Sequence, residues 1–184
     1  MRHSLRRISI TAGIVSAALL GTSQTSAVAA PVKPAPASTP AAVPAPAPAG
    51  GEVSLGNTGS PENTLGTSAV CFFYTRGDYV HVSSTAFEAS GHGWWVNVDC
   101  NATWAVVTVQ LQEYYSDGTW RNKGTVGSAT VRSGGGAGNR ATGRAGCYNS
   151  SLTGWRSVID VDLVGLADDP NKLTTAAQNI YCRR

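Results

Sequence analysis

The sequence predicts an all-β fold, an antiparallel two-sheet sandwich or small barrel held by two disulfides. Short runs rich in valine, threonine and aromatic residues alternate with turn residues through most of the 184-residue chain. Four cysteines lie in the same region, and an even number in an exported chain is typical of paired disulfides. Many short strands separated by frequent turns indicate a sandwich or a barrel.

The candidate strands share this composition and are Val70–Tyr74, Tyr79–Thr85, Trp94–Asp99, Ala105–Tyr115, Thr119–Val126, Ala129–Ser133, Arg140–Tyr148, Trp155–Gly165 and Asn179–Cys182. The turns between them are Arg76-Gly77-Asp78, Gly91-His92-Gly93, Asp117-Gly118 and Gly134-Gly135-Gly136. Asp117-Gly118 gives the strongest hairpin signal, because both residues tolerate positive φ. Elsewhere, Pro170–Gln178 could form one short helix, with Asp169 as its cap and Pro170 at the first position.

The first part of the chain predicts export. Arg2, Arg6 and Arg7 precede the short apolar run Ile8–Leu20, and Ala27-Val28-Ala29 is a typical cleavage pattern. We therefore expect a signal peptide over residues 1–29. A segment rich in alternating proline and alanine follows and favours extended polyproline II. We expect a disordered spacer over residues 30–61 and one disulfide-stapled β domain over residues 62–184.

Cys71, Cys100, Cys147 and Cys182 can form two disulfides in three ways. We favour the sequential pairing, Cys71–Cys100 and Cys147–Cys182. Each bond would close a loop of about 30 residues and stabilise the domain by about 3–4 kcal/mol. Together with the signal peptide, the cysteines predict a secreted, extracellular protein.

Charge and hydropathy exclude two classes of partner. Without Arg2, Arg6 and Arg7 the chain carries equal numbers of acidic and basic side chains, and it has no basic cluster. A nucleic-acid-binding protein normally presents a basic stripe, so we expect no nucleic acid as partner. No second apolar segment follows the signal peptide, so we expect no membrane span.

The stretch Trp155–Gly165 contains two aspartates at alternate positions. Strand alternation assigns Trp155, Ile159, Val161 and Leu163 to the core, and Arg156, Val158, Asp160, Asp162 and Val164 to the outer face. The two carboxyls would lie about 6.5–7 Å apart, at the lower edge of the spacing in inverting glycosidases. Arg156 would lower the pKa that a general acid needs raised, and calcium would require Asp168 and Asp169 to fold back. We favour a solvated strand face.

Other chemistry is weakly signalled. His81 lies within a predicted strand and His92 within a glycine turn, and neither belongs to a zinc-ligand spacing. There is no G-x-S-x-G elbow for a nucleophilic serine. We therefore expect no catalytic residue, no metal and no cofactor, and an enzyme is not the favoured interpretation.

Aromatic residues give the strongest functional signal. Phe72-Phe73-Tyr74, Trp94-Trp95 and Tyr114-Tyr115 place rings on both faces of their strands, whereas only one face of each sheet can enter the core. Some rings must be covered by loops or exposed, and exposed aromatics rimmed by polar groups mark binding sites. The candidate ligand-binding residues are Trp94, Trp95 and Trp120.

Cys100 with Trp104, the segment Asp117–Gly124, Cys147 with Trp155–Gly165, and Cys182 together resemble small secreted actinobacterial four-cysteine β proteins of unknown function. The chain is also distantly similar to tendamistat-type amylase inhibitors, which are all-β with two sequentially paired disulfides. It lacks their Trp-Arg-Tyr triplet, since Ser157 follows Trp155-Arg156. The favoured function is a non-catalytic extracellular binding domain for a polysaccharide or a protein. The alternative is a secreted inhibitor of an extracellular hydrolase.

Overall fold

A computed structural model of the chain describes residues 38–46, 53–61 and 70–184. The predicted signal peptide, residues 1–29, lies outside these ranges. Within them, no helix is long and apolar enough to cross a membrane.

The described residues form eleven strands and no helix. The strands are β1 (Val53–Pro61), β2 (Cys71–Gly77), β3 (His81–Val82), β4 (Glu88–Asn97), β5 (Ala105–Tyr114), β6 (Trp120–Val131), β7 (Ala141–Gly146), β8 (Asn149–Leu163), β9 (Leu166–Asp168), β10 (Leu173–Thr174) and β11 (Gln178–Arg183).

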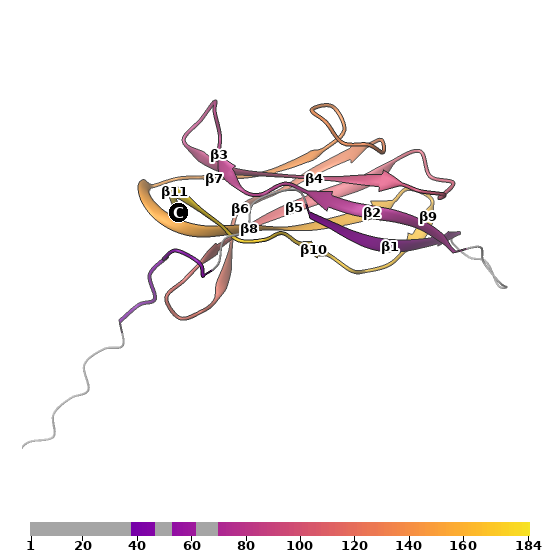
Figure 1. The fold of residues 1–184 in the computed structure, drawn as a ribbon. Coiled ribbons are helices and arrows are strands. Elements are labelled where there is room, and N and C mark those ends of the chain that lie inside the picture. Colours follow the sequence, from indigo (N-terminus) through magenta and orange to yellow (C-terminus); the bar gives the residue numbers. More distant parts are fainter. Residues whose placement is uncertain (1–37, 47–52, 62–69) are drawn as a thin grey trace, which may run out of the picture. The chain divides into compact units, whose positions relative to one another are not determined.

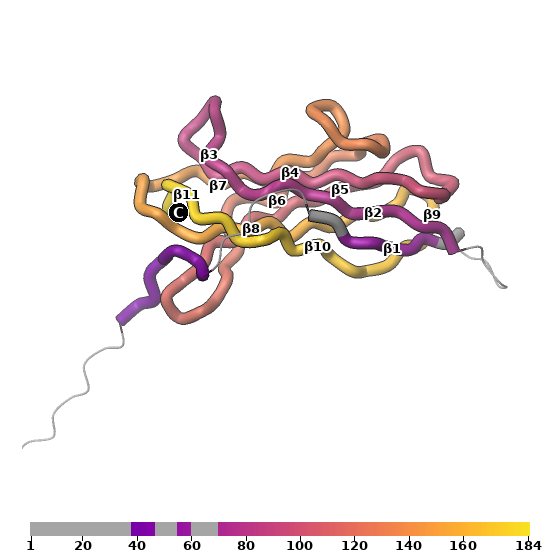
Figure 2. Tube along the Cα trace, in the orientation of Figure 1, coloured from indigo at the N-terminus to yellow at the C-terminus, as the bar shows by residue number. Residues whose placement is uncertain are grey.

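The strands pair antiparallel in the order β10-β8-β5-β6-β7-β4-β2-β1-β9, with β11 beside β8 and β3 beside β4. We call β9, β1, β2, β4, β7 and β3 the first sheet, and β6, β5, β8, β10 and β11 the second sheet. The two layers are seen in Figure 1, and the C-terminal strand β11 follows β8 in Figure 2. Because the path does not close, the predicted all-β antiparallel fold is confirmed as an open sandwich.

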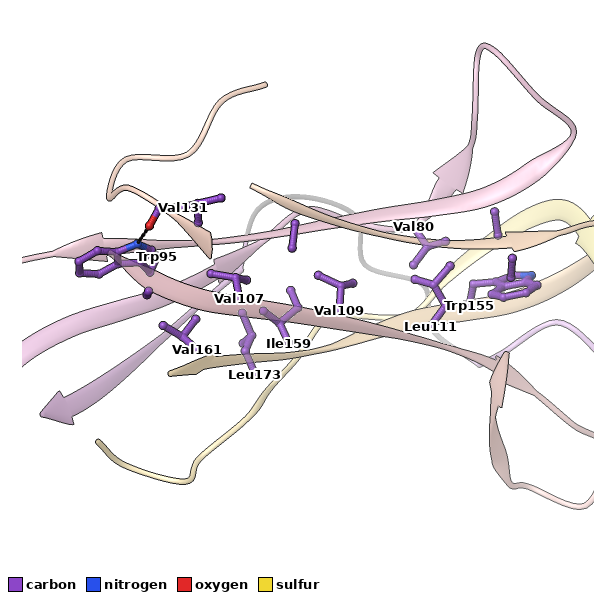
Figure 3. Close-up of a cluster of buried hydrophobic side chains, with 14 of the residues drawn as sticks. Val80, Trp95, Val107, Val109, Leu111, Val131, Trp155, Ile159, Val161 and Leu173 are labelled. Carbon is purple, nitrogen blue, oxygen red and sulfur yellow. Dashed lines mark hydrogen bonds between the residues drawn. The ribbon is translucent and has the colours of Figure 1, made fainter. Parts of the chain in front are cut away.

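Strict alternation in β5 and β8 builds the core. Val107, Val109 and Leu111 on β5 and Ile159 on β8 are fully buried, and the residues between them are partly exposed. Figure 3 shows these side chains between the two layers. Trp155, Val161 and Leu163 are buried as well, so the predicted core face of β8 is confirmed.

Glycines on the first sheet let the second sheet approach closely. A Cβ atom on Gly93 would lie 2.7 Å from Ile159 Cγ2 and 2.9 Å from Val109 Cγ2. Gly91 faces the same core, next to Leu111. The prediction of a turn at Gly91-His92-Gly93 is therefore wrong: these glycines lie inside β4 because the facing side chains leave no room for larger residues.

Both disulfides follow the sequential pairing. Cys71 at the start of β2 bonds to Cys100 after β4, with 29 residues between them in sequence separation. Cys147, between β7 and β8, bonds to Cys182 on β11, with a separation of 35. Each bond ties a peripheral segment to a central strand of its sheet.

The predicted helix at Pro170–Gln178 is wrong. Asp169 caps locally, accepting a hydrogen bond from the Asn171 backbone N–H, but the chain then continues as β10. Leu173 is buried and pairs with Ile159, and the Thr175 hydroxyl accepts a bond from the Ser157 N–H. The edge of β8 needs hydrogen-bond partners, and this requirement overrides a weak local helical preference.

Two described segments fall within residues 30–61, where the sequence analysis predicts a disordered spacer. β1 pairs with β2, and Leu55 packs against the core. Residues 38–46 border β5, β8 and β11: the Val43 N–H donates to the Tyr114 carbonyl, and Ala45 exchanges two bonds with the Asn179 side chain. The ordered body therefore includes residues before Glu62, and that boundary was not predicted.

The glycine contact makes a matched prediction. Gly93→Ala forces a methyl group against Ile159 and Val109, and overpacking of this kind destabilises a domain by about 1–3 kcal/mol. Gly56→Ala is the control, because its nearest neighbour would be a Tyr74 ring carbon at 3.7 Å. Urea unfolding should show a lower midpoint for Gly93→Ala and a nearly unchanged one for Gly56→Ala. Equal midpoints would contradict the close approach of the sheets.

Candidate functional site

The outer face of the second sheet collects the polar side chains that alternate with the core. We call it the outer face, and it consists of the solvent-facing residues of β6, β5 and β8. Register places Thr108 of β5 between Ser128 and Asp160, and Gln112 between Asn122 and Arg156. Directly opposite side chains in antiparallel strands share a face, so these residues form successive polar rows.

A concavity of about 300 Å³ opens in this face. Its lining includes Thr108, Gln110, Gln112, Asn122, Asp160 and Lys172. A bulge in β6 contributes to it: pairing passes from Val109–Gly127 to Leu111–Lys123, leaving extra residues on β6. In that bulge Thr125 pairs with Arg144 of β7, so β6 passes between the two sheets beside the concavity.

Hydrogen bonds fix the amides of this face. Gln112 Nε2 donates to Asn122 Oδ1 at 2.9 Å, and Arg156 Nε donates to Gln112 Oε1 at 2.8 Å. Gln110 Nε2 donates to the Lys123 carbonyl at 2.9 Å and so satisfies backbone left unpaired by the bulge. Because their rotamers are held, these amides present polar atoms in set directions.

Trp120 lies at one end of the face. Its ring centroid is 5.0 Å from that of Tyr114, which is directly opposite on β5, and the Arg156 guanidinium lies 4.4 Å from the Trp120 centroid. Burial lowers the pKa of Arg156. The indole is half-buried, with its orientation fixed by an aromatic and a cationic neighbour.

A second tryptophan–arginine pair lies at the other end. The Arg132 guanidinium is 4.7 Å from the Trp104 ring centroid, and Trp104 is 39% exposed. Its neighbours Ala105 and Val131 are buried, so alternation turns Trp104 and Arg132 outward. The sequence analysis did not select Trp104, because it precedes its strand and only the register shows which way it points.

Asp160 and Asp162 occupy the solvated side of β8, as predicted. Asp160 Oδ2 lies 2.5 Å from Lys172 Nζ, and this bond raises the pKa of Lys172. Burial, then the neighbouring Asp160 charge, raises the pKa of Asp162. The cation beside Asp160 is thus Lys172, whereas Arg156 bonds to Gln112, contrary to the role the sequence suggested for Arg156. With Asp160 held in an ion pair, the two carboxyls do not form a matched acid and base.

The three predicted tryptophans do not form one site. Trp95 is fully buried, its Nε1 donates to the Val131 carbonyl, and its ring meets Phe73 edge-on, so its assignment to ligand binding is wrong. Trp94 is half-buried on the outer side of the first sheet, opposite Arg76 and against Gly135. Of the three, Trp120 alone lies on the outer face of the second sheet.

A different cluster lies on the first sheet. Asp78, His81 and His92 each offer one metal-ligating atom, and these atoms lie within 4.8 Å of one another. Sequence reasoning treated His81 and His92 separately, because spacing gives no sign that a bulge brings them together. In comparisons with protein-family models, curated proteins and solved structures, no match was found. The resemblances given by the sequence therefore stay predictions.

The acidic pair makes a prediction about pH. Because the pKa of Asp162 is raised in the folded chain, its protonated form favours folding, and that contribution is lost as pH rises through the folded pKa. Asp162→Asn should raise the free energy of unfolding at neutral pH, by no more than about 0.5 kcal/mol for so exposed a side chain. Below the ordinary carboxyl pKa of about 3.9, the variant and the parent should unfold alike.

Asp117→Asn is the control of opposite sign. Hydrogen bonding from the Thr119 hydroxyl, opposed by some burial, lowers the pKa of Asp117. This substitution should therefore lower the urea midpoint at neutral pH. A shift of the same sign in both variants would contradict the electrostatic assignment.

Proposed function

We propose that the chain is a secreted, non-catalytic binding domain and that its outer face on the second sheet binds an extended glycan. The two disulfides are typical of proteins that work outside the cell, which supports secretion. The observation that carries the proposal is the row of fixed amides between two tryptophan–arginine pairs.

The chemistry of this row matches that of a sugar chain. Glycans present hydroxyl groups that both donate and accept hydrogen bonds, and amide side chains such as Gln112 and Asn122 can do the same. Amides already held by neighbours lose little conformational entropy when a ligand binds. The apolar face of a sugar ring can pack against a flat indole such as Trp120.

The dimensions of the face favour an oligomer over a single ring. From Trp104 to Tyr114 the chain advances about 34 Å at the usual rise of a strand. The concavity lies between these ends, and the Asp160–Lys172 pair keeps its local charge balanced. A neutral polysaccharide therefore fits better than a strongly charged polymer.

The experiment is retention of the purified chain on insoluble polysaccharides, with cellulose, chitin and bacterial cell-wall material as probes. We expect retention on at least one of them. Trp120→Ala should weaken it about tenfold, corresponding to about 1.4 kcal/mol of lost contact. Circular dichroism should confirm that the variant keeps the parent's β spectrum.

Tyr74→Ala is the matched control. Tyr74 is 41% exposed on the first sheet, and the Arg76 guanidinium lies 5.6 Å from its ring centroid, so it repeats the aromatic–arginine pairing away from the outer face. Its retention should be unchanged. Loss in Tyr74→Ala but not in Trp120→Ala would overturn the site. Inhibition of an amylase or protease panel without any retention would favour the hydrolase inhibitor instead.

A further inference from the structure

We propose that Asp78, His81 and His92 bind a divalent transition-metal ion of the zinc class on the outer side of the first sheet. Two imidazoles and a carboxylate form a ligand set that suits zinc, copper or nickel better than calcium or magnesium, which favour oxygen alone. This site is separate from the glycan-binding face, since it lies on the other sheet.

A one-residue bulge brings the three side chains together. β2 pairs with β4 up to Gly77–Gly93, and β3 resumes the pairing at His81–Ser90, so the β2–β3 side has one residue more than β4. In a regular strand, residues three apart such as Asp78 and His81 point to opposite faces. The extra residue turns both toward His92, while Val80 stays fully buried in the core. Bulges that redirect a side chain are common beside functional sites.

Asp78 holds His92 in an orientation suited to metal binding. Asp78 Oδ1 accepts a bond from the His92 backbone N–H at 2.8 Å, and Asp78 Oδ2 lies 2.6 Å from His92 Nδ1. With its proton on Nδ1, the imidazole keeps a lone pair on Nε2. A carboxylate behind a histidine in this way is the usual support for a zinc ligand, and it raises the basicity of the ring.

His81 completes a site that is open on one side. Its ring centroid lies 5.2 Å from that of His92, and its Nδ1 is 3.4 Å from the Tyr79 carbonyl. Asp78 and His81 are half-buried whereas His92 is buried, so the cluster is anchored on the sheet and reaches solvent at its outer edge. The protein supplies at most three ligands, which leaves a coordination position for water or for a group on a partner.

The test is zinc binding by the oxidised full chain, purified without a histidine tag and treated with a chelator. We expect one zinc ion per chain by isothermal titration, a higher melting temperature with zinc, and visible absorption from bound cobalt. His81→Gln should weaken zinc binding at least about tenfold, and Asp78→Asn about 10–100-fold through the orientation of His92. His81 is partly exposed, so its variant should fold as the parent does, with the same melting temperature in chelator.

Asp162→Asn is the control, because it removes an exposed carboxylate on the second sheet and should leave zinc binding unchanged. The described cysteines are all in disulfides, so thiols do not compete for the metal. Absence of stoichiometric zinc binding would overturn the proposal, as would equal binding by His81→Gln and the parent. Equal loss in Asp162→Asn would show that zinc binds nonspecifically to surface acids.

Discussion

The close approach of Val109 and Ile159 to the glycines of the first sheet is the contact on which the rest of the fold depends. Gly91 and Gly93 have no side chain, so branched residues of the second sheet fill the space that a Cβ would take. A shift of one residue in β5 or β8 would turn its apolar side chains to solvent and its polar ones inward. Core packing therefore also decides which residues form the outer face.

Irregularities in this otherwise regular pairing create both candidate sites. The bulge in β6 adjoins the concavity of the outer face and draws Gln110 to the Lys123 carbonyl. The bulge between β2 and β3 places Asp78 and His81 on the side of His92. In each case one strand carries more residues than its partner, and the disturbed backbone exposes polar groups that a regular ladder would use internally.

Composition and alternation were enough to predict the class of fold, the disulfide pairing and the two faces of β8. The Asp117-Gly118 turn was also predictable, and Gly118 adopts the positive φ that such a turn uses. Contacts between distant segments were not. Leu55 reaches the core from a stretch that follows a proline-rich segment, Trp95 rather than Trp94 turns inward, and Lys172 meets Asp160 only once β10 has paired with β8. Such features depend on register and bulges, which a single sequence does not reveal.

Hydrogen–deuterium exchange resolved to single residues tests the central claim most directly. If β5 and β8 are the central strands packed on the glycine-lined first sheet, their amides over residues 105–111 and 157–163 should exchange most slowly, and only through global unfolding. Amides of β1 and β9, at the edge of the first sheet, should exchange sooner. Exchange in β5 and β8 as fast as in β1 would contradict this packing and the outer face that it defines.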